Sequence, residues 1–255
     1  MDLSPDIAIV TGASSGLGRR FAEVLAANGA YVVCAARRAD RLSELVGKIE
    51  AAGGRAAAVS FDAEASDACE ALVKAAETLA GTPSILVNNA GMSTAGRAQD
   101  ISCEDYDRTM TVNVKAPWHL SQLCARPWIA STQNSKANAL RIVNIASIAG
   151  WRTVPGASVY AMSKAAVVHM THGHAREWAR YGIRVNALCP GYFRTELNDT
   201  YWDSPAGQAD FARLPRRRLG TPEQLDKALL FLVDPENDFT NGASLAVDDA
   251  QSQVL

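Results

Sequence analysis

Two residues four positions apart, Tyr160 and Lys164, carry side chains that could move a proton. The pattern predicts a helix over residues 158–181, in which this spacing places both side chains on one face. A free tyrosine has a pKa near 10, and a neighbouring ammonium favours the phenolate and lowers that pKa. A tyrosine tuned in this way can exchange a proton with a carbonyl or alcohol oxygen.

Ser147 stands at the end of an apolar run that begins at Arg141 and is typical of a buried strand. A hydroxyl at a strand end can hydrogen-bond the same oxygen that Tyr160 would serve. A Tyr-x-x-x-Lys pair is also common on an ordinary amphipathic helix, so the surrounding pattern has to decide its meaning.

A glycine-rich turn near the start of the chain supplies that context. The apolar run 7–10 leads into Thr-Gly-Ala-Ser-Ser-Gly-Leu-Gly at 11–18, and a predicted helix over 19–28 ends at Gly29. A strand, a glycine turn and a helix N-terminus form a phosphate site, because unpaired N–H groups and a positive dipole meet there. A turn built only for tight packing is the alternative. The residues expected to bind phosphate are Gly12, Ser14, Ser15, Gly16, Leu17 and Gly18.

The glycine turn, the strand ending at Ser147 and the Tyr160–Lys164 pair together resemble the short-chain dehydrogenase/reductase family in its single-domain form. The resemblance covers nearly the whole chain. It implies an α/β fold: a Rossmann-like, doubly wound parallel sheet of about seven strands with helices on both faces, in one domain over residues 1–255. The alternation of predicted strands and helices agrees with this.

The resemblance also assigns roles to residues. Tyr160 becomes the general acid of reduction and the base of oxidation, Lys164 lowers its pKa and binds the nicotinamide ribose, and Ser147 orients the substrate oxygen. Asn113, in Met-Thr-Val-Asn-Val at 110–114 of a long predicted helix over 105–130, would bend that helix and support a proton path through water. The family's other cofactor contacts correspond here to Asn89, Ala90, Gly91, Pro190, Gly191 and Thr195.

The end of the second predicted strand bears on the choice of cofactor. A carboxylate there would bind the ribose 2′-hydroxyl and repel a 2′-phosphate, but this chain has Ala36 followed by Arg37 and Arg38. Two guanidiniums favour NADP(H), with NAD(H) as the alternative if they only begin a solvated helix. Ser15 is a departure, since family members that prefer NADP(H) often carry a basic residue there. Asp62 would contact the adenine ring or serve only in a turn.

The substrate side is less patterned. Residues 192–220 correspond to the family's mobile lid. Apolar side chains next to the catalytic residues predict an apolar, aryl-sized pocket. The residues expected to line it are Ser147, Trp151, Val154, Tyr160, Tyr192 and Phe193. Asp249 stands where the family more often has glycine, which puts a close backbone approach there in doubt.

Composition excludes several classes of function. The chain has 255 residues and a net charge of −2, so it lacks the basic field expected for nucleic acid or anionic membrane. Five cysteines without a Cys-x-x-Cys motif, and an acidic N-terminus unlike a signal peptide, predict a reducing, cytoplasmic location. His169, His172 and His174 have no ligand partners at zinc spacing, so no metal is expected.

The expected function is NADP(H)-dependent transfer of hydride between the nicotinamide and a carbonyl or secondary alcohol, in a carbonyl reductase or alcohol dehydrogenase. One alternative is a 3-oxoacyl-thioester reductase, whose carrier or coenzyme A could meet the arginines at 216–218, although surface ion pairs also explain that run. A non-catalytic dinucleotide sensor is an alternative of another class. The family resemblance implies a homotetramer.

Overall fold

The computed structural model describes residues 1–131, 140–196 and 198–253. A loop expected over 131–138 falls almost wholly outside these residues. Seven strands form one parallel sheet in the order β3-β2-β1-β4-β5-β6-β7, which confirms the predicted fold class. The strands are β1 (Ile7–Thr11), β2 (Tyr31–Ala36), β3 (Arg55–Ser60), β4 (Ile85–Asn88), β5 (Arg141–Ile145), β6 (Arg184–Pro190) and β7 (Ser244–Val247).

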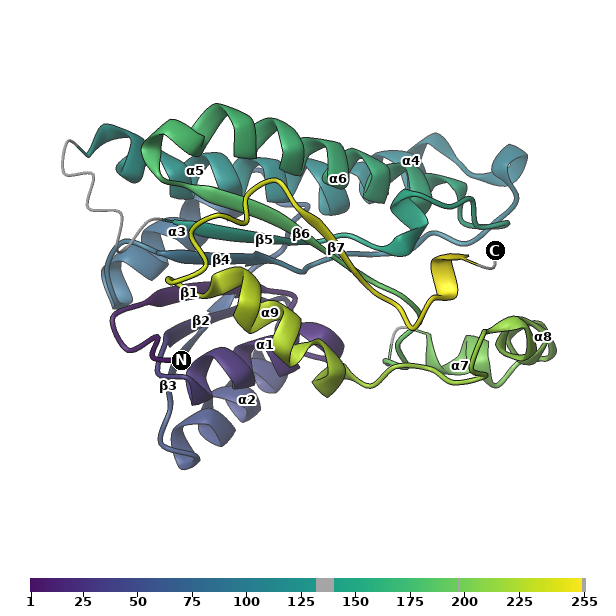
Figure 1. Ribbon diagram of the computed structural model, residues 1–255, viewed down its shortest axis with the longest axis horizontal. Coiled ribbons are helices and arrows are strands. Elements are labelled where there is room, and N and C mark those ends of the chain that lie inside the picture. The colour runs from purple at the N-terminus through teal and green to yellow at the C-terminus, as the bar shows by residue number, and fades with distance from the viewer. Residues whose placement is uncertain (132–139, 197, 254–255) are drawn as a thin grey trace.

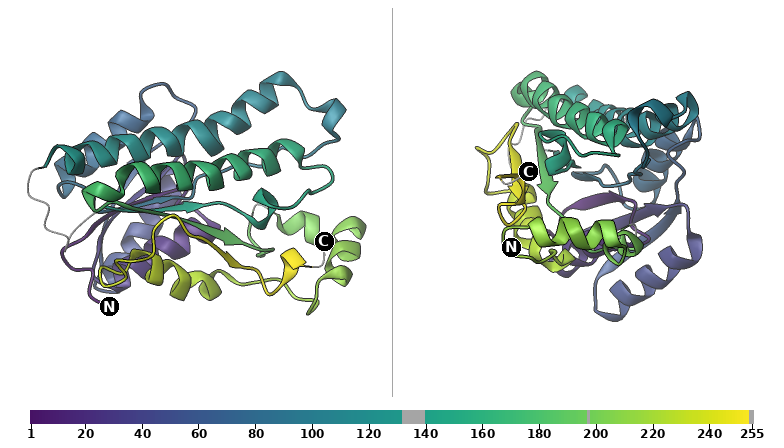
Figure 2. Two further views of the ribbon diagram at one scale, coloured as in Figure 1. Left: turned by 45° about the horizontal axis from the view of Figure 1, so that its top comes forward. Right: turned by 90° about the vertical axis from the view of Figure 1, so that its right-hand side faces the viewer.

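Helices cover both faces of the sheet (Figures 1 and 2). One face carries α1 (Gly16–Ala27), α2 (Ala39–Ala51) and α9 (Asp226–Val233). The other carries α3 (Ala68–Leu79), α4 (Cys103–Met110), α5 (Ala116–Ala130) and α6 (Ser158–Trp178). The central strands are continuous apolar runs because both of their faces are buried. In the described part of the chain, no helix is long and apolar enough to cross a membrane.

Two short helices, α7 (Asp199–Trp202) and α8 (Pro205–Arg213), lie beyond the carboxyl ends of the strands (Figure 1). They fall in the region expected to form the lid. Behind them, Thr221 and Gln224 form a capping box, with Pro222 as the first residue of a 3₁₀ turn over Pro222–Leu225 that leads into α9. This confirms the expected N-cap at Thr221 and leaves the α-helix to begin one turn later.

The single helix expected over 105–130 is interrupted. Five residues, Thr111–Lys115, form a π-helix between α4 and α5. Pro117, the second residue of α5, has no N–H to offer the carbonyl of Asn113 four residues earlier, so the regular α pattern cannot continue through this point. The predicted bend at Asn113 therefore takes the form of a wide turn that turns the Asn113 side chain inward, where it is 1% exposed.

The sheet order reverses at β1, which pairs with β2 on one side and with β4 on the other. The chain first builds β2 and β3 on one side of β1 and then β4 to β7 on the other. In open parallel sheets, ligands bind beyond the carboxyl ends of the strands at such a switch point. The glycine turn follows β1 and the Asn88–Gly91 segment follows β4, so both lie at this position.

A buried ion pair fastens the opposite edge of the sheet, where the strands begin. Arg141 Nη2 contacts the carboxylate of Asp6, and the two side chains are 1% and 3% exposed. Ser84 Oγ donates to Asp6 Oδ1 at 2.7 Å, and Arg141 Nη1 donates to the carbonyl of Val233 at 2.9 Å. The pair thus joins the residues just before β1 and β4, the first residue of β5 and the last residue of α9.

Replacing Asp6 with asparagine should destabilise the protein strongly, because the Arg141 guanidinium would remain buried without its counter-charge. We expect a loss of about 3–5 kcal/mol in the free energy of unfolding, measured by urea denaturation. Glu64→Gln, which removes the exposed ion pair with Arg108, is the matched control and should change stability little. Equal losses in the two variants would contradict this assignment.

Candidate active site

The glycine turn between β1 and α1 has no room for a side chain at Gly12 and Gly18, and its backbone is left-handed at Gly12 and Gly16. Gly12 and Gly16 have φ of +68° and +54°, in the left-handed region that favours glycine. A Cβ at Gly12 would lie 2.8 Å from Asn89 Nδ2, and one at Gly18 would lie 2.3 Å from the carbonyl oxygen of Gly12. The turn therefore exposes backbone N–H groups at the start of α1, as the phosphate-site prediction requires, and it also packs tightly.

Asn89 ties this turn to the end of β4. Its Nδ2 donates to the carbonyl of Thr11 at 2.9 Å, and Thr11 Oγ1 accepts from the backbone N–H groups of Asn89 and Ala90, each at 3.0 Å. The two loops that flank the switch point thus form one hydrogen-bonded unit. Gly91 follows, and a Cβ there would lie 3.5 Å from Asn113 Oδ1 and 3.6 Å from Lys164 Nζ.

A chain of buried amides continues from this unit into the sheet. Asn88 Nδ2 donates to Asn144 Oδ1 at 2.8 Å and to Ser121 Oγ at 3.1 Å, and Asn144 Nδ2 donates to Thr171 Oγ1 at 2.9 Å. These contacts join β4, β5, α5 and α6. They agree with the expectation that the Asn88–Gly91 motif stabilises the central sheet.

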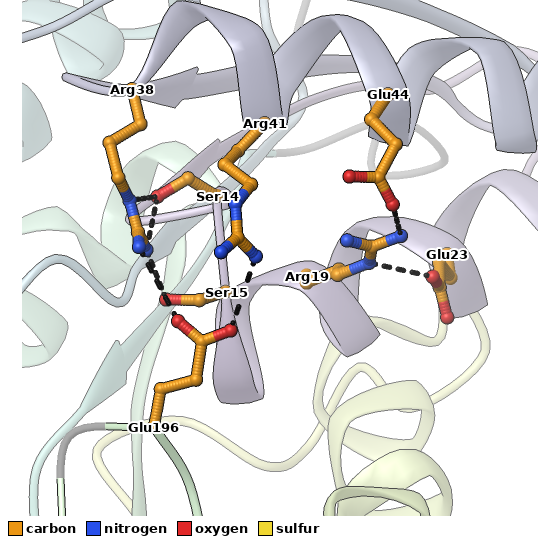
Figure 3. Close-up of polar contacts among 8 residues, drawn as sticks. All are labelled: Ser14, Ser15, Arg19, Glu23, Arg38, Arg41, Glu44 and Glu196. Atoms are coloured by element: carbon orange, nitrogen blue, oxygen red, sulfur yellow. Dashed lines mark hydrogen bonds and ion pairs between the residues drawn. The ribbon is translucent and has the colours of Figure 1, made fainter.

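Two arginines converge beside the glycine turn (Figure 3). Arg38 donates to Ser14 Oγ from Nε at 3.2 Å and from Nη2 at 3.0 Å, and its Nη2 also donates to Ser15 Oγ at 2.6 Å. Arg41 lies next to it, and both guanidiniums pair with Glu196. The Arg38 guanidinium thus contacts Ser15, the position at which NADP(H)-preferring members of the family often carry a basic residue and this chain has serine.

Arg37 lies elsewhere, contrary to the expectation that it and Arg38 form one phosphate site. Its side chain is 66% exposed and pairs with Glu64 at 3.9 Å, because successive residues leave a strand end in different directions. Asp62 Oδ1 accepts from the N–H of Glu64 at 3.1 Å, so the turn role of Asp62 is realised. Helix α3 begins only at Ala68, and its N-cap is Asp67.

Sequence reasoning passed over Arg41 as a site residue. The signal was present: Arg38 and Arg41 are three positions apart at the start of a helix, a spacing that puts two side chains on one face. Glu196 could not be found in this way, because it comes from a segment far away in the sequence.

Ser147, Tyr160 and Lys164 meet at the carboxyl end of β5. Tyr160 and Lys164 lie one turn apart on α6, with Lys164 Nζ 5.7 Å from the centre of the Tyr160 ring. Lys164 Nζ donates to the carbonyl of Ile145 at 2.8 Å, and the residue is 5% exposed. Ser147 hydrogen-bonds Tyr160 and also accepts from the N–H of Ala149 at 3.1 Å. The expected grouping of the three side chains is therefore present.

The pKa of Tyr160 departs from the expectation. Burial raises it, and the hydrogen bond from Ser147 opposes that effect. Burial also lowers the pKa of Lys164 to about 8, because the ammonium has left water without a carboxylate partner. The prediction that Tyr160 has a lowered pKa is thus wrong for the protein alone, since desolvation of the phenolate outweighs the hydrogen bond from Ser147.

Asn113 holds the backbone around this group. Its Oδ1 accepts from Met92 N at 2.9 Å, and its Nδ2 donates to Met92 O at 2.9 Å and to Ser163 Oγ at 2.9 Å. With both ends of its amide engaged, the side chain fixes the segment after Gly91 against α6.

The segment after β6 returns to the glycine turn. β6 ends at Pro190, and Gly191 has no space for a side chain, since a Cβ there would lie 2.4 Å from Gln251 Oε1. Further on, Thr195 packs against Gly16, whose added Cβ would lie 3.5 Å from Thr195 Cβ. The structure therefore brings Thr195 to the proposed phosphate position.

The expected substrate residues divide into two groups. Trp151 is 44% exposed, Val154 is half-buried, and Tyr192 is close enough to Tyr160 to influence its pKa. Phe193 belongs to the hydrophobic core instead, at 7% exposure, so its assignment to the pocket is wrong. Its ring fills the space above Gly220, where a Cβ would lie 2.5 Å from the ring.

Phe193 and Gly220 also join the two ends of the segment over 192–220 that is expected to form the lid. They form a parallel bridge, in which Gly220 N donates to Tyr192 O at 2.9 Å and Arg194 N donates to Gly220 O at 3.2 Å. Within the lid, Trp202 is 2% exposed and meets Tyr192 edge to face, with ring centres 5.2 Å apart. Its indole N–H has no hydrogen-bond partner among the described residues.

The remaining candidates have structural partners. Asp249 adopts φ of +51°, and its carboxylate pairs with Arg216 at 3.1 Å and Arg218 at 2.7 Å. This confirms surface ion pairs for two residues of the arginine run. His174 stacks on Trp178 at 4.2 Å.

Comparison with known proteins agrees with this geometry. A family model described as short chain dehydrogenase matches residues 6–206. Gluconate 5-dehydrogenase of Gluconobacter oxydans is 36% identical, over 96% of this chain and 94% of that protein. The BbsD subunit of (2S)-[(R)-hydroxy(phenyl)methyl]succinyl-CoA dehydrogenase of Thauera aromatica is 35% identical, over 99% and 98%.

A solved structure is equally similar along its whole length. The gluconate 5-dehydrogenase of Burkholderia cenocepacia, crystallised with NADP and tartrate, has a TM-score of 0.91 and 32% identity, covering 100% of this chain and 98% of the other. Sequence, sheet order and the grouping of Ser147, Tyr160 and Lys164 all lead to the same assignment. The chain belongs to the short-chain dehydrogenase/reductase family.

Proposed function

We propose that the protein is an NADP(H)-dependent oxidoreductase that interconverts a carbonyl and a secondary alcohol, with Tyr160 as general acid and base. The observation that carries this is the buried Lys164 beside Tyr160, which is 5% exposed and has no carboxylate partner among the residues that the structure describes. A buried cation without a counter-charge destabilises a fold, and residues with pKa values perturbed in this way cluster at active sites.

The residues present fit a dinucleotide. The glycine turn offers backbone N–H groups to a diphosphate, and Gly91 lies beside Lys164 and Asn113, since a Cβ there would be 3.6 Å from Lys164 Nζ and 3.5 Å from Asn113 Oδ1. Arg38, with Ser14 and Ser15, and Arg41 supply donors for a 2′-phosphate, and no acidic residue stands at Ala36 to repel it. The NADP in the Burkholderia relative supports the same choice.

In the mechanism, the bound nicotinamide supplies or accepts the hydride. Tyr160 donates its proton to the substrate oxygen in reduction and accepts one from the alcohol in oxidation. The Ser147 hydroxyl holds that oxygen and hydrogen-bonds Tyr160. Lys164 favours the phenolate when it forms and would bind the nicotinamide ribose. Asn113 supports the route by which protons reach Lys164, since its contacts fix Gly91 and α6 around the ammonium.

We propose an apolar, aryl-sized substrate. Tyr192 lies close enough to Tyr160 to influence its pKa, and the buried Trp202 packs edge to face on Tyr192 with ring centres 5.2 Å apart. Trp151, which is 44% exposed, is the further aromatic residue that we assign to the pocket. The Thauera relative, whose name contains a phenyl group, supports this, and the same name contains a coenzyme A thioester, which supports the acyl-thioester alternative. Against that alternative, Arg216 and Arg218 are engaged by Asp249.

Replacing Tyr160 with phenylalanine should lower kcat for ketone reduction by about 10²–10⁴-fold, because the proton donor is lost. NADPH consumption with aryl ketones and with 3-oxoacyl thioesters measures this and separates the two substrate classes. NADPH affinity, followed by fluorescence titration, should remain. Tyr181→Phe, in the 3₁₀ turn Ala179–Tyr181 that follows α6, is the control and should keep full activity. If Tyr160→Phe retained most of the activity, the assignment would be wrong, and NADPH binding without any turnover would indicate a sensor.

The pH dependence follows from the Tyr160–Lys164 pair. Burial lowers the pKa of Lys164 to about 8 and raises that of Tyr160, so the pair should release its first proton near pH 8. Alcohol oxidation needs a proton acceptor, so its kcat/KM should rise with pH through about 8, while ketone reduction should fall.

Lys164→Met leaves a buried tyrosine alone, so the oxidation midpoint should move to higher pH. Lys164→Arg keeps a charge and should shift it less, although the different shape should slow the reaction. The measurement is kcat/KM against pH for the three proteins with one alcohol. An unchanged midpoint in Lys164→Met would leave the lysine as a ribose anchor only.

We propose a homotetramer, because two separate surfaces expose large apolar side chains. One includes Trp118 and Met162 on α5 and α6, at 44% and 45% exposure, beside a hollow lined by Val114 and Met170. The other includes Phe231 and Phe239, at 48% and 99%. A tetramer with two-fold symmetry axes needs two self-complementary surfaces, whereas a dimer needs one.

Light scattering should therefore give a tetramer mass for the wild type. Trp118→Asp and Phe239→Asp should each give dimers, since each disrupts one surface, and the double variant should give monomers. Leu79→Asp, at a third exposed apolar position, should stay tetrameric. A monomeric wild type at micromolar concentration would contradict both interfaces. We also propose a cytoplasmic location, in keeping with five unpaired cysteines.

A further inference from the structure

Glu196 lies where the 2′-phosphate of NADP(H) is expected. Its two carboxylate oxygens are divided between two cations: Oε2 pairs with Arg38 Nη1 at 3.4 Å, and Oε1 pairs with Arg41 Nη1 at 3.3 Å (Figure 3). Arg38 in turn holds the hydroxyls of Ser14 and Ser15 on the glycine turn. Within the described residues, these guanidiniums have no other carboxylate partner.

The same donors suit a phosphate monoester better than a carboxylate. A phosphate carries about −1.5 to −2 charges at pH 7 and three acceptor oxygens, so it can use both guanidiniums and the serine hydroxyls together. Glu196 carries one charge and uses only the guanidiniums. Two anions at one pair of cations would repel each other, so the phosphate and the Glu196 carboxylate cannot both hold this position.

The Glu196 carboxylate is held weakly enough for a ligand to displace it. Glu196 is exposed, it follows Thr195, which packs on Gly16, and it stands just before α7 at the start of the lid. Both of its ion pairs are half-exposed, with side-chain exposures of 41–54%, and such pairs hold weakly. A phosphate can therefore displace it at moderate cost.

We propose that Glu196 is a specificity-determining residue that competes with the 2′-phosphate for Arg38 and Arg41, and so narrows the preference for NADP(H) over NAD(H). This inference rests on the proposed NADP(H) cofactor. NAD(H) carries a hydroxyl in place of the phosphate, so it leaves the ion pairs of Glu196 with Arg38 and Arg41 intact. The cost of breaking them falls on NADP(H) alone.

The test is direct binding of NADPH and NADH to wild type and to Glu196→Gln, measured by fluorescence titration without substrate. The variant should bind NADPH about three- to tenfold more tightly, the gain expected from no longer breaking two half-exposed ion pairs. Its NADH dissociation constant should stay within about twofold of the wild-type value.

Glu44→Gln is the matched control, because Glu44 is an exposed glutamate on α2 that pairs with Arg19 and not with Arg38 or Arg41 (Figure 3). It removes the same charge nearby. Because the Glu44 carboxylate also interacts with Arg41 at longer range, this variant should tighten NADPH binding much less than Glu196→Gln does and should leave the NADH dissociation constant unchanged. An equal gain in Glu44→Gln would reduce the effect to net charge and overturn the inference. So would unchanged or weaker NADPH binding in Glu196→Gln. A wild type that binds no NADPH would instead overturn the proposed cofactor.

Discussion

Lys164 is buried, and burial disfavours the charged form of its side chain. Several elements of the fold hold the ammonium in this position. The ammonium is held by one backbone carbonyl, that of Ile145 at the end of β5, and has no carboxylate partner. Asn113 hydrogen-bonds the backbone of Met92, and Gly91 brings the chain close to the ammonium, since a Cβ there would lie 3.6 Å from Lys164 Nζ. A charge kept in this way interacts strongly with any charge that develops on Tyr160, because little water is present to screen it.

The amino and carboxyl ends of the strands, called here the amino edge and the carboxyl edge of the sheet, have different roles. At the amino edge, Asp6 and Arg141 form a buried ion pair that joins neighbouring strands. At the carboxyl edge, the glycine turn and Lys164 keep donors available for a ligand. A rigid edge behind the site allows the other edge to hold groups in arrangements that do not stabilise the fold by themselves, which is a common division between scaffold and site.

Much of this was predictable from the sequence, and the limits have physical causes. Apolar runs and glycines report local constraints, so the strands, the glycine turn and the Tyr160–Lys164 pair were predicted correctly. Phe193 was assigned to the pocket because sequence proximity to a site does not say which way a side chain points. Arg41 and Glu196 come together only through the fold, because Glu196 belongs to the segment after β6, far from Arg41 in the sequence. The raised pKa of Tyr160 reflects burial, which spacing along a helix does not reveal.

The bridge between Phe193 and Gly220 gives the lid segment a particular architecture. Its two ends are joined at the sheet, so the segment leaves and re-enters the core at one point, and its length is largely independent of the strands around it. The entropic penalty of closing such a loop grows only slowly with the number of residues. Evolution can therefore lengthen, shorten or replace this cassette while the catalytic residues stay in register. A fold with this arrangement can change its substrate side by altering one surface segment whose ends are joined, while its core stays the same.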